Sequence, residues 1–202
     1  DDIYPPASSA VETGIMLAEV RAELGTIGLK LQEAKLKWIA NQRVESDMLG
    51  NNNEILHRSE SFTVLGSVVC GNMSETEAHD HRVSQSWKCF HKWQHILCAF
   101  HTPLKDRLDF WCKTVCRSLD WCLETCRANE VSLKKLHTAQ SLQIAKMMGI
   151  KRKKLENDCF EPWIDWNKRR FRASNGVIEA NDLDIRAILH KKRLSWAAHV
   201  SR

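Results

Sequence analysis

The chain has 202 residues, of which 43% are hydrophobic and 27% charged, and it contains only 8 glycines and 4 prolines. This composition excludes a low-complexity or disordered chain and fits one large or two small folded domains. No apolar run approaches the roughly 18 residues that a membrane-spanning helix needs, and the N-terminus lacks the layout of a signal peptide. We therefore expect an intracellular protein, nuclear or cytoplasmic, with no membrane partner.

The net charge of +5 is unevenly distributed along the chain. Residues 146–202 contain 14 Lys or Arg against 7 Asp or Glu, a net charge of +7, whereas the rest of the chain has a net charge of −2. This asymmetry predicts contact with a polyanion, most simply a nucleic acid. A solvated helix face is the alternative, and charge alone does not separate the two.

The first part of the chain mixes helix and strand signals. Apolar residues every three or four positions between residues 16 and 27 predict an amphipathic helix that ends near Gly28. Gly50 and the asparagines at 51–53 are typical of a turn, with a strand on either side. Residues 62–69 are rich in β-branched side chains and predict a short strand or hairpin.

Helical periodicity dominates the rest of the chain. Apolar stripes over residues 83–97 and at spacings of 4, 3, 4 and 4 over residues 104–119 predict two helices. Thr102 is predicted to cap the second of them, with Pro103 in its first turn. Residues 132–148 predict another helix before Gly149, and one or two shorter helices are expected after it.

The 8 cysteines are expected to be free thiols, because the chain has no secretion signal. The spacings of Cys112, Cys116, Cys122 and Cys126 fit no common zinc finger, and cysteines four apart on a helix are typical small core residues. His91 and Cys98 would lie about 10 Å apart along a helix, which is too far to share a metal ion. We expect no zinc, and a zinc-stabilised helical protein is kept only as a third possibility.

Five segments carry a pattern that extends over nearly the whole chain. Residues 1–3 read DDI, 28–37 read GLKLQEAKLK, 62–68 read FTVLGSV, 119–125 read LDWCLET, and 188–202 read ILHKKRLSWAAHVSR. In this order they resemble motifs in the C-terminal part of a reverse transcriptase of the non-LTR retrotransposon type. The chain departs from the family pattern at Val64, at Trp121 and Cys122, and at Ala198, where the family usually has Tyr, Tyr-Gly and Gly.

The resemblance implies an α+β fold that is predominantly helical. Residues 1–72 would be the remnant of a reverse transcriptase palm with a primer-grip-like strand, residues 73–150 a helical thumb-like bundle, and residues 151–202 a basic helical extension. Because position 1 is Asp rather than Met, we expect the sequence to begin inside a longer chain or to have been trimmed.

Reverse transcription is phosphoryl transfer assisted by two divalent metal ions, which carboxylates hold. By resemblance, Asp1 and Asp2 are a vestigial catalytic pair that would bind Mg²⁺ or Mn²⁺ only in a complete palm; an accidental pair of aspartates is the alternative. The third palm aspartate and the fingers would precede residue 1, and Pro5 and Pro6 stand where the family has an apolar strand. The parent would be an RNA-directed DNA polymerase, a nucleotidyltransferase, and this chain is expected to be inactive alone.

The resemblance also places four residues beside the primer and the incoming nucleotide. Lys35, as a catalytic cation, and Lys37 would balance charge on the leaving phosphate, and Leu65 and Gly66 would hold the primer end. The alternatives are two exposed lysines on a strand edge and a simple turn.

The C-terminal segment interleaves aromatic and basic residues. Arg169, Arg170, Lys191, Lys192 and Arg193 are predicted to contact an RNA–DNA hybrid or another nucleic acid, with tryptophans able to stack on bases. The alternative is a set of helices whose tryptophans face the core while the cations face water. The competing hypothesis for the whole chain is a helical nucleic-acid-binding or interaction module without polymerase ancestry.

Overall fold

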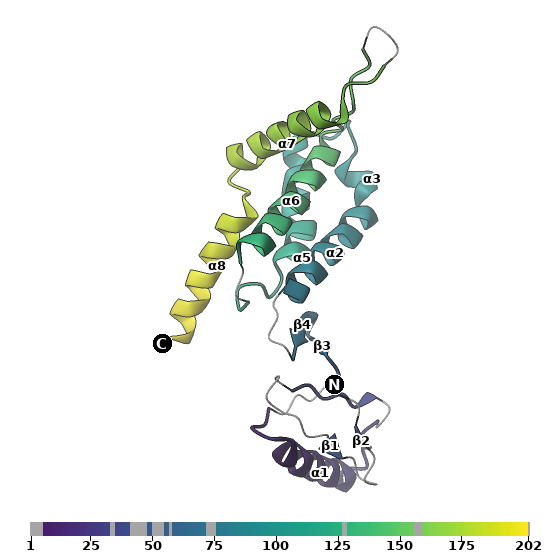
Figure 1. The fold of residues 1–202 in the computed structure, drawn as a ribbon, viewed down its shortest axis with the longest axis vertical. Helices are drawn as coiled ribbons and strands as arrows, with labels where there is room; N and C mark the ends of the chain where they lie inside the picture. The colour runs from purple at the N-terminus through teal and green to yellow at the C-terminus, as the bar shows by residue number, and fades with distance from the viewer. Residues whose placement is uncertain are drawn as a thin grey trace. The chain divides into compact units, whose positions relative to one another are not determined.

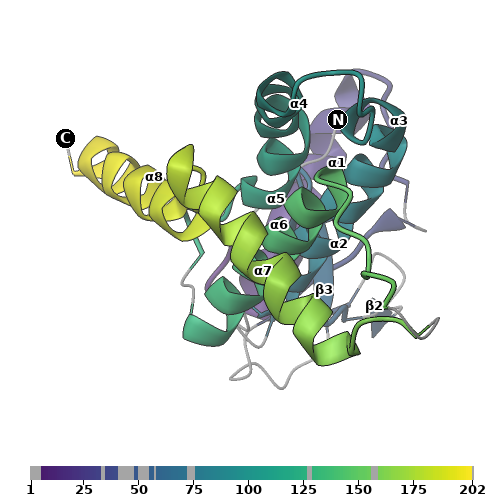
Figure 2. The same ribbon diagram turned by 90° about the horizontal axis from the view of Figure 1, so that it is seen from above.

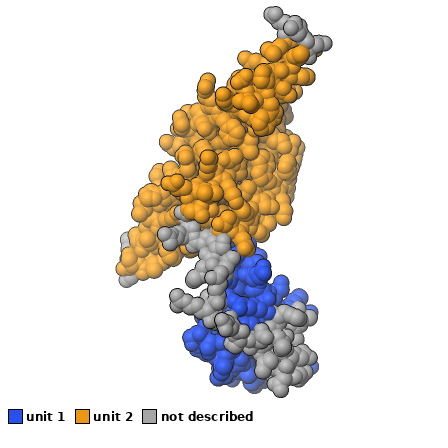
Figure 3. Space-filling view, viewed as in Figure 1, with its two compact units in different colours: residues 1–74 blue, residues 75–202 orange. Residues whose placement is uncertain are grey.

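The structure, a computed structural model, divides the chain into two compact units, residues 1–74 and residues 75–202 (Figure 3). It describes residues 6–32, 35–40, 48–49, 55–56, 58–71, 76–126, 129–155 and 159–201. All the named strands of these residues belong to the first unit, and the second unit is built from helices. The predicted domain boundary at residue 72 lies close to the division at residue 74, whereas the one at residue 150 falls inside the second unit.

The first unit begins with helix α1, Ala10–Thr26. Ser9 caps its start, because the Ser9 hydroxyl accepts a hydrogen bond from the Glu12 amide at 3.1 Å. In return, the Glu12 carboxylate accepts a hydrogen bond from the Ser8 amide at 2.7 Å. The helix predicted from the apolar spacing of residues 16–27 is present, but none of its residues is buried, so the predicted apolar face does not pack into a core.

Two small antiparallel sheets follow, formed by β1 (Met48–Leu49), β2 (Ile55–Leu56), β3 (Ser61–Val64) and β4 (Ser67–Cys70). The β1–β2 pair flanks the turn predicted at residues 50–53, which lie outside the described residues. The β3–β4 pair is a hairpin with a two-residue loop in which Leu65 and Gly66 have φ values of 47° and 81°. Positive φ at both loop positions defines a type I′ turn, which matches the twist of the strands. The strand or hairpin predicted for residues 62–69 is therefore a hairpin.

The second unit consists of helices α2 (Thr76–Lys92), α3 (Gln94–Leu97), α4 (Leu104–Trp111), the π-helix η2 (Cys112–Cys116), α5 (Arg117–Asp120), α6 (Glu130–Met147), α7 (Trp163–Ala180) and α8 (Ile185–Val200). Helix α6 is central, because α2, α4, α7 and α8 all contact it (Figures 1 and 2). The α4, η2 and α5 segments run on from one another; η2 and α5 pack against α2, and α4 packs against α3 and α6. The predicted helix over residues 104–119 is confirmed, with one π-helical turn in its middle.

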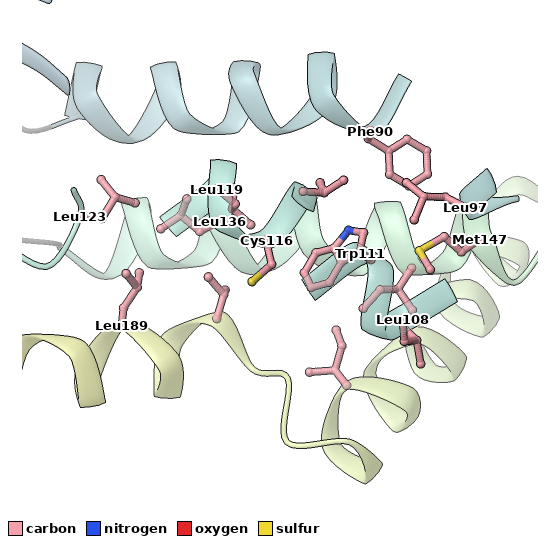
Figure 4. Packing of buried hydrophobic residues seen from close by; sticks show 14 residues of the cluster. Phe90, Leu97, Leu108, Trp111, Cys116, Leu119, Leu123, Leu136, Met147 and Leu189 are labelled. Atoms are coloured by element: carbon pink, nitrogen blue, oxygen red, sulfur yellow. The ribbon is translucent and has the colours of Figure 1, made fainter. Parts of the chain in front are cut away.

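One hydrophobic core holds the second unit together (Figure 4). Every predicted apolar position from Leu108 to Leu119 is buried in it, and Leu104 packs against its edge. Helix α6 contributes Leu136, Ile144 and Met147, and α8 contributes Ile185 and Leu189. Burying this much apolar surface is the main stabilising contribution to a helical unit of this kind.

A buried arginine ties together the ends of three segments. The Arg107 guanidinium donates hydrogen bonds to the carbonyl oxygens of Leu97 (3.0 Å), Thr102 (3.0 Å) and Met147 (2.6 Å). These groups include carbonyls near the ends of α3 and α6, which have no partner within their own helices. The predicted cap at Thr102 is wrong: Pro103 is the N-cap residue of α4 and makes no side-chain cap.

The fold class predicted from the sequence, α+β and predominantly helical, is confirmed. Over the part of the chain that the structure describes, no helix is long and apolar enough to cross a membrane. All 8 cysteines are free thiols. Cys116 is buried in the core and Cys112 packs against it, as expected for small core residues.

Candidate nucleic-acid interface

The predicted catalytic pair, Asp1 and Asp2, lies outside the described residues. Among the residues that are described, no three His, Cys, Asp or Glu side chains are placed to hold a metal ion together. A site for Mg²⁺ or Mn²⁺ would require a third carboxylate besides Asp1 and Asp2. The described residues do not provide such a donor set.

Lys35 and Lys37 are exposed and lie on an irregular segment. The Lys35 amide donates to the Gln32 carbonyl at 2.9 Å in a short turn, and neither lysine is in a strand. The alternative, two exposed lysines on a strand edge, is therefore wrong about the strand. It is correct that both lysines are exposed.

The segment after Lys37 packs against the open end of the β3–β4 hairpin. The Ser59 amide donates to the Trp38 carbonyl at 2.9 Å, and Arg58 Nη2 donates to the Ala40 carbonyl at 3.0 Å. Gly71 permits the approach, because a Cβ there would lie 2.4 Å from the Ala40 oxygen. These contacts place Lys37 near the base of the hairpin.

Leu65 and Gly66 form the opposite end of the same hairpin, and Leu65 is 82% exposed. A four-residue strand separates the two ends by about 10 Å, at roughly 3.3 Å per residue. The structure therefore brings the lysine segment and the predicted primer-grip turn into one unit without bringing them into contact. Their roles beside a primer stay predictions.

Four of the five predicted basic residues of the C-terminal segment have partners inside the protein. Arg169 forms a two-bond ion pair with Glu161, at 2.6 and 3.0 Å, and also donates to the Lys151 carbonyl at 2.9 Å. The Arg170 guanidinium lies 4.4 Å from the centre of the Trp166 ring and donates to Asn167 Oδ1 at 2.7 Å. Arg169 therefore holds α7 to the segment before it, whereas these contacts of Arg170 lie within α7 itself.

On α8, too, predicted basic residues have partners within the protein. Lys192 Nζ lies 2.7 Å from Oδ2 of Asp120, a residue that is only 2% exposed, and Arg193 donates to the carbonyls of Leu123 and Cys126. Burial raises the pKa of Asp120, and the nearby Lys192 opposes this effect. Lys191 is the one predicted residue of the five that is exposed.

A group of exposed residues lies where α7 begins, at the start of the segment in which the sequence interleaves aromatic and basic residues. Ahead of α7, residues 151–155 pair with residues 159–161. The pairing consists of a β-bridge between Lys154 and Phe160 and backbone hydrogen bonds from the Leu155 amide to the Cys159 carbonyl and from the Glu161 amide to the Lys153 carbonyl. We call residues 151–155 and 159–164 the α7 corner. Its exposed members are Lys151, Arg152, Lys153, Lys154, Leu155, Cys159, Phe160, Pro162, Trp163 and Ile164. Lys168 and Arg172 continue the exposed basic surface along α7.

Two exposed tryptophans, one in the α7 corner and one in α8, correct one sequence-based alternative. Trp163 is 63% exposed and Trp196 is 44% exposed, so the view that these tryptophans face the core is wrong. The sequence contained a signal that Lys168 and Arg172 lie beside Ile164, since positions 164, 168 and 172 share one helix face. The contact of Glu161 with Arg169 had no such signal, because it joins a residue before the helix to one inside it.

Two open clefts lie between helices of the second unit. One, of about 410 Å³, lies between α2 and α6 and is lined by Val83, Trp87, Leu142 and the lysines Lys134 and Lys135, among others. The other, of about 320 Å³, lies between the η2–α5 segment and α8, where Lys191 and Lys192 lie beside Asp120. Neither cleft contains the Lys35, Leu65 or Arg169 positions.

The chain matches no family model, and comparison with the curated proteins and with the solved structures gives no match. The resemblance to reverse transcriptases therefore rests on the five sequence segments alone.

Proposed function

We propose that the chain is the C-terminal fragment of an RNA-directed DNA polymerase of the retrotransposon type, and that it binds the phosphate backbone of nucleic acid without copying it. The order of the five sequence segments supports the ancestry. The exposed cations of the second unit support the binding, which is the part of the proposal that the geometry addresses.

The observation that carries the binding is the division of the C-terminal cations into two sets. Arg169, Lys192 and Arg193 have carboxylate or carbonyl partners within the protein. Lys168 and Arg172 are exposed, and no described carboxylate forms an ion pair with them. When exposed cations such as Lys168 and Arg172 contact phosphates, counterions leave the nucleic acid. This release makes binding favourable and dependent on salt.

Binding of the full chain to a labelled RNA–DNA hybrid over a series of salt concentrations tests the proposal. We expect the affinity to fall steeply with salt. Replacing two cations in Lys168→Gln/Arg172→Gln should lower the slope of log affinity against log salt by up to about 2. Lys88→Gln/Lys92→Gln is the matched control, because both lysines are exposed and four apart on α2.

Three results would count against the proposal. The absence of hybrid binding at low salt would remove nucleic-acid binding as the function of this chain. An equal loss in the control variant would show that net charge matters rather than the α7 surface. Extension of a primer in the presence of Mg²⁺ or Mn²⁺ would contradict the expected inactivity.

A second candidate function, a helical interaction module without polymerase ancestry, is favoured by the cleft between α2 and α6. Its lining is largely apolar, with Val83, Trp87 and Leu142 beside exposed lysines. An apolar groove of this kind suits a helix from a protein partner. If Trp87→Ala changes binding to a protein partner but leaves hybrid binding unchanged, this second function exists beside or instead of the first.

A further inference from the structure

The α7 corner exposes large apolar side chains in a basic surrounding. Phe160 is 57% exposed, Trp163 63% and Ile164 63%. Three peptide units separate Phe160 from Trp163, so their Cα atoms lie no more than about 11 Å apart. Two exposed aromatic side chains at such nearby positions favour a ligand with flat faces.

The backbone that carries these rings is held firmly. Arg152 donates to the Glu161 carbonyl through Nε at 2.9 Å and through Nη2 at 2.5 Å, and the Lys153 amide donates to the Glu161 carboxylate at 3.2 Å. The same carboxylate accepts both bonds from Arg169, so one residue joins the paired chain to α7. A site whose frame is fixed before binding loses less conformational entropy when its ligand arrives.

A second set of contacts joins α7 to residues 150 and 151 of the preceding segment. The Trp166 indole donates to the Ile150 carbonyl at 3.1 Å, and Arg169 holds the Lys151 carbonyl at 2.9 Å. The Arg152 guanidinium lies 5.6 Å from the centre of the Phe160 ring, where a cation and an aromatic face attract each other. Phe160 therefore has a cation beside it while more than half of its surface is accessible.

The charge around the rings is positive. Residues 151–172 contain eight Lys or Arg against four Asp or Glu. One of the acidic residues, Glu161, is neutralised by its ion pair with Arg169. The surrounding charge is therefore complementary to an anionic ligand, and Lys153 and Lys168 are exposed on either side of the rings in sequence.

An anionic ligand with flat faces is a nucleic acid whose bases are unpaired. In a duplex the bases stack on one another, so exposed rings can stack only on bases that a single strand presents. A lipid surface suits the corner less well. The apolar exposure on α7 stops after Ile164, where the exposed charged residue Asp165 follows, so too little apolar surface is present to insert into a bilayer.

The geometry points to the α7 corner as a binding site for single-stranded RNA or DNA, in which Phe160 and Trp163 stack on bases while Lys153 and Lys154 contact phosphates. This inference rests on the proposed nucleic-acid binding and deepens it, because it assigns the unpaired strand to a separate surface with its own chemistry. In a template with an overhang, duplex and single strand would then contact different residues of the same unit.

The test compares two probes on the full chain by fluorescence anisotropy: a labelled single-stranded oligonucleotide, as RNA and as DNA, and the RNA–DNA hybrid. We expect Phe160→Ala and Trp163→Ala each to weaken single-strand binding about fivefold to about a hundredfold, which is the range for loss of one stacked base. Hybrid binding should change less than about twofold. Phe160→Tyr and Trp163→Phe keep an aromatic face and should restore most of the affinity.

Trp121→Ala is the control, since Trp121 is 51% exposed in the same unit but lies outside the α7 corner. Circular dichroism of every variant shows whether the helices are retained. Because the two conservative variants keep the rings, their recovery separates stacking from a loss of structure at the corner.

Each result supports or overturns the inference. If the hybrid binds and the single strand does not, or if the alanine variants bind the single strand as the unmodified chain does, the site does not exist and the proposed function stands. If neither probe binds, the proposed function fails together with the inference. If vesicles containing phosphatidylserine bind in place of nucleic acid and lose binding in the alanine variants, the corner binds membranes instead.

Discussion

At the scale of single residues, the core of the second unit contains a hydrogen-bonded chain of three polar groups. The Trp111 indole donates to the Gln143 side-chain oxygen at 3.1 Å, and the Gln143 amide donates to the Ser86 hydroxyl at 3.1 Å. All three residues are fully buried and come from α4, α6 and α2. A buried network in which each member has a partner fixes how the three helices meet.

Trp111→Phe tests this network. Phenylalanine keeps most of the apolar contact but leaves the Gln143 oxygen without its donor, so the free energy of unfolding should fall by about 1–3 kcal/mol. Urea unfolding followed by circular dichroism measures the change. Trp163→Phe, at an exposed position, should alter stability by less than about 0.5 kcal/mol. Equal effects of the two substitutions would show that the buried hydrogen bond contributes nothing.

Thiol reactivity gives a second prediction at this scale. Burial raises the pKa of the Cys116 thiol to about 12, so at pH 8 about one molecule in ten thousand carries the reactive thiolate. Cys159 is exposed. Alkylation with iodoacetamide at pH 8, followed by mass spectrometry of the peptides, should therefore modify Cys159 at least about tenfold faster than Cys116. Comparable rates at the two sites would contradict the burial of Cys116.

At the scale of elements, the ion pair between Glu161 and Arg169 anchors the α7 corner. The hydrogen bonds from Arg169 lower the pKa of Glu161 to about 2. A lowered carboxyl pKa means that folding favours the ionised form, so the stabilisation is complete above the ordinary value of 4.5 and is lost as the pH falls from there through about 2. The corner should accordingly keep its structure unchanged between pH 8 and pH 5.

Glu161→Gln imitates the protonated carboxyl at neutral pH. We expect the amides of Leu155 and Glu161, which donate across the paired chain, to exchange with deuterium several times faster in this variant. Hydrogen–deuterium exchange with mass spectrometry of the peptide covering residues 150–162 measures the effect. Glu179→Gln changes the same charge at the other end of α7 and should leave that peptide unaffected. Unchanged exchange in Glu161→Gln would show that the ion pair does not hold the corner.

Helix α8 is attached through a different ion pair, between Lys192 and the buried Asp120. Lys192→Met leaves that carboxylate without its partner and should lower the free energy of unfolding by about 2–3 kcal/mol at pH 7, somewhat less than for a fully buried pair because Lys192 is partly exposed. Burial already raises the pKa of Asp120. Since the neutral acid tolerates burial, the loss should shrink as the pH is lowered from 7 to 5.

Urea unfolding of Lys192→Met at the two pH values tests this prediction. Lys191→Met removes the neighbouring, exposed charge and should change stability by less than about 0.5 kcal/mol at either pH. A loss in Lys192→Met that is the same at pH 5 and pH 7 would mean that the unpaired carboxylate is not its cause.

The sequence predicted the helices before Gly149 because their signals are local, whereas α7 and α8, with 18 and 16 residues, are longer than the short helices expected there. The apolar stripe from Leu104 to Leu119 repeats every three or four residues, and the structure buries the selected positions from Leu108 to Leu119, with Leu104 at the edge of the core. The cap predicted at Thr102 failed because Pro103 took the capping position and Thr102 offers its carbonyl to Arg107 instead. The π-helical turn at residues 112–116 had no sequence signal.

The division of the cations could not be predicted, because it depends on distant partners. Lys192 meets a carboxylate 72 positions earlier in the chain, and Arg193 meets carbonyls 67 and 70 positions earlier. Composition shows that the C-terminal segment is basic, but only the packing of α8 decides which cations are already occupied. For the same reason the sequence left open whether the tryptophans of this segment face solvent or the core, since a tryptophan near helical apolar positions is most often a core residue.

At the scale of the whole molecule, the two units differ in how much apolar core they contain. The hydrophobic cluster lies entirely within residues 75–202 and draws on every helix from α2 to α8. Among residues 6–32, 35–40 and 58–71, Trp38 is the only hydrophobic residue that is buried, and α1 buries none of its residues. The stability of the chain should therefore come mainly from the second unit.

A fragment of residues 75–202 tests this difference. Because it contains the whole cluster, it should unfold cooperatively with a midpoint within about 3 °C of the main transition of the full chain, a shift that corresponds to about 1 kcal/mol or less. Seven of the eight tryptophans lie in this fragment, so tryptophan fluorescence follows the same core in both proteins, and Trp38→Phe in the full chain removes the one signal from residues 1–74. A fragment that stays unfolded, or that melts more than about 10 °C lower, would show that the core of the second unit depends on residues 1–74. In that case nucleic-acid binding should require the complete chain, because α7, which carries the exposed cations, would not be folded in the fragment.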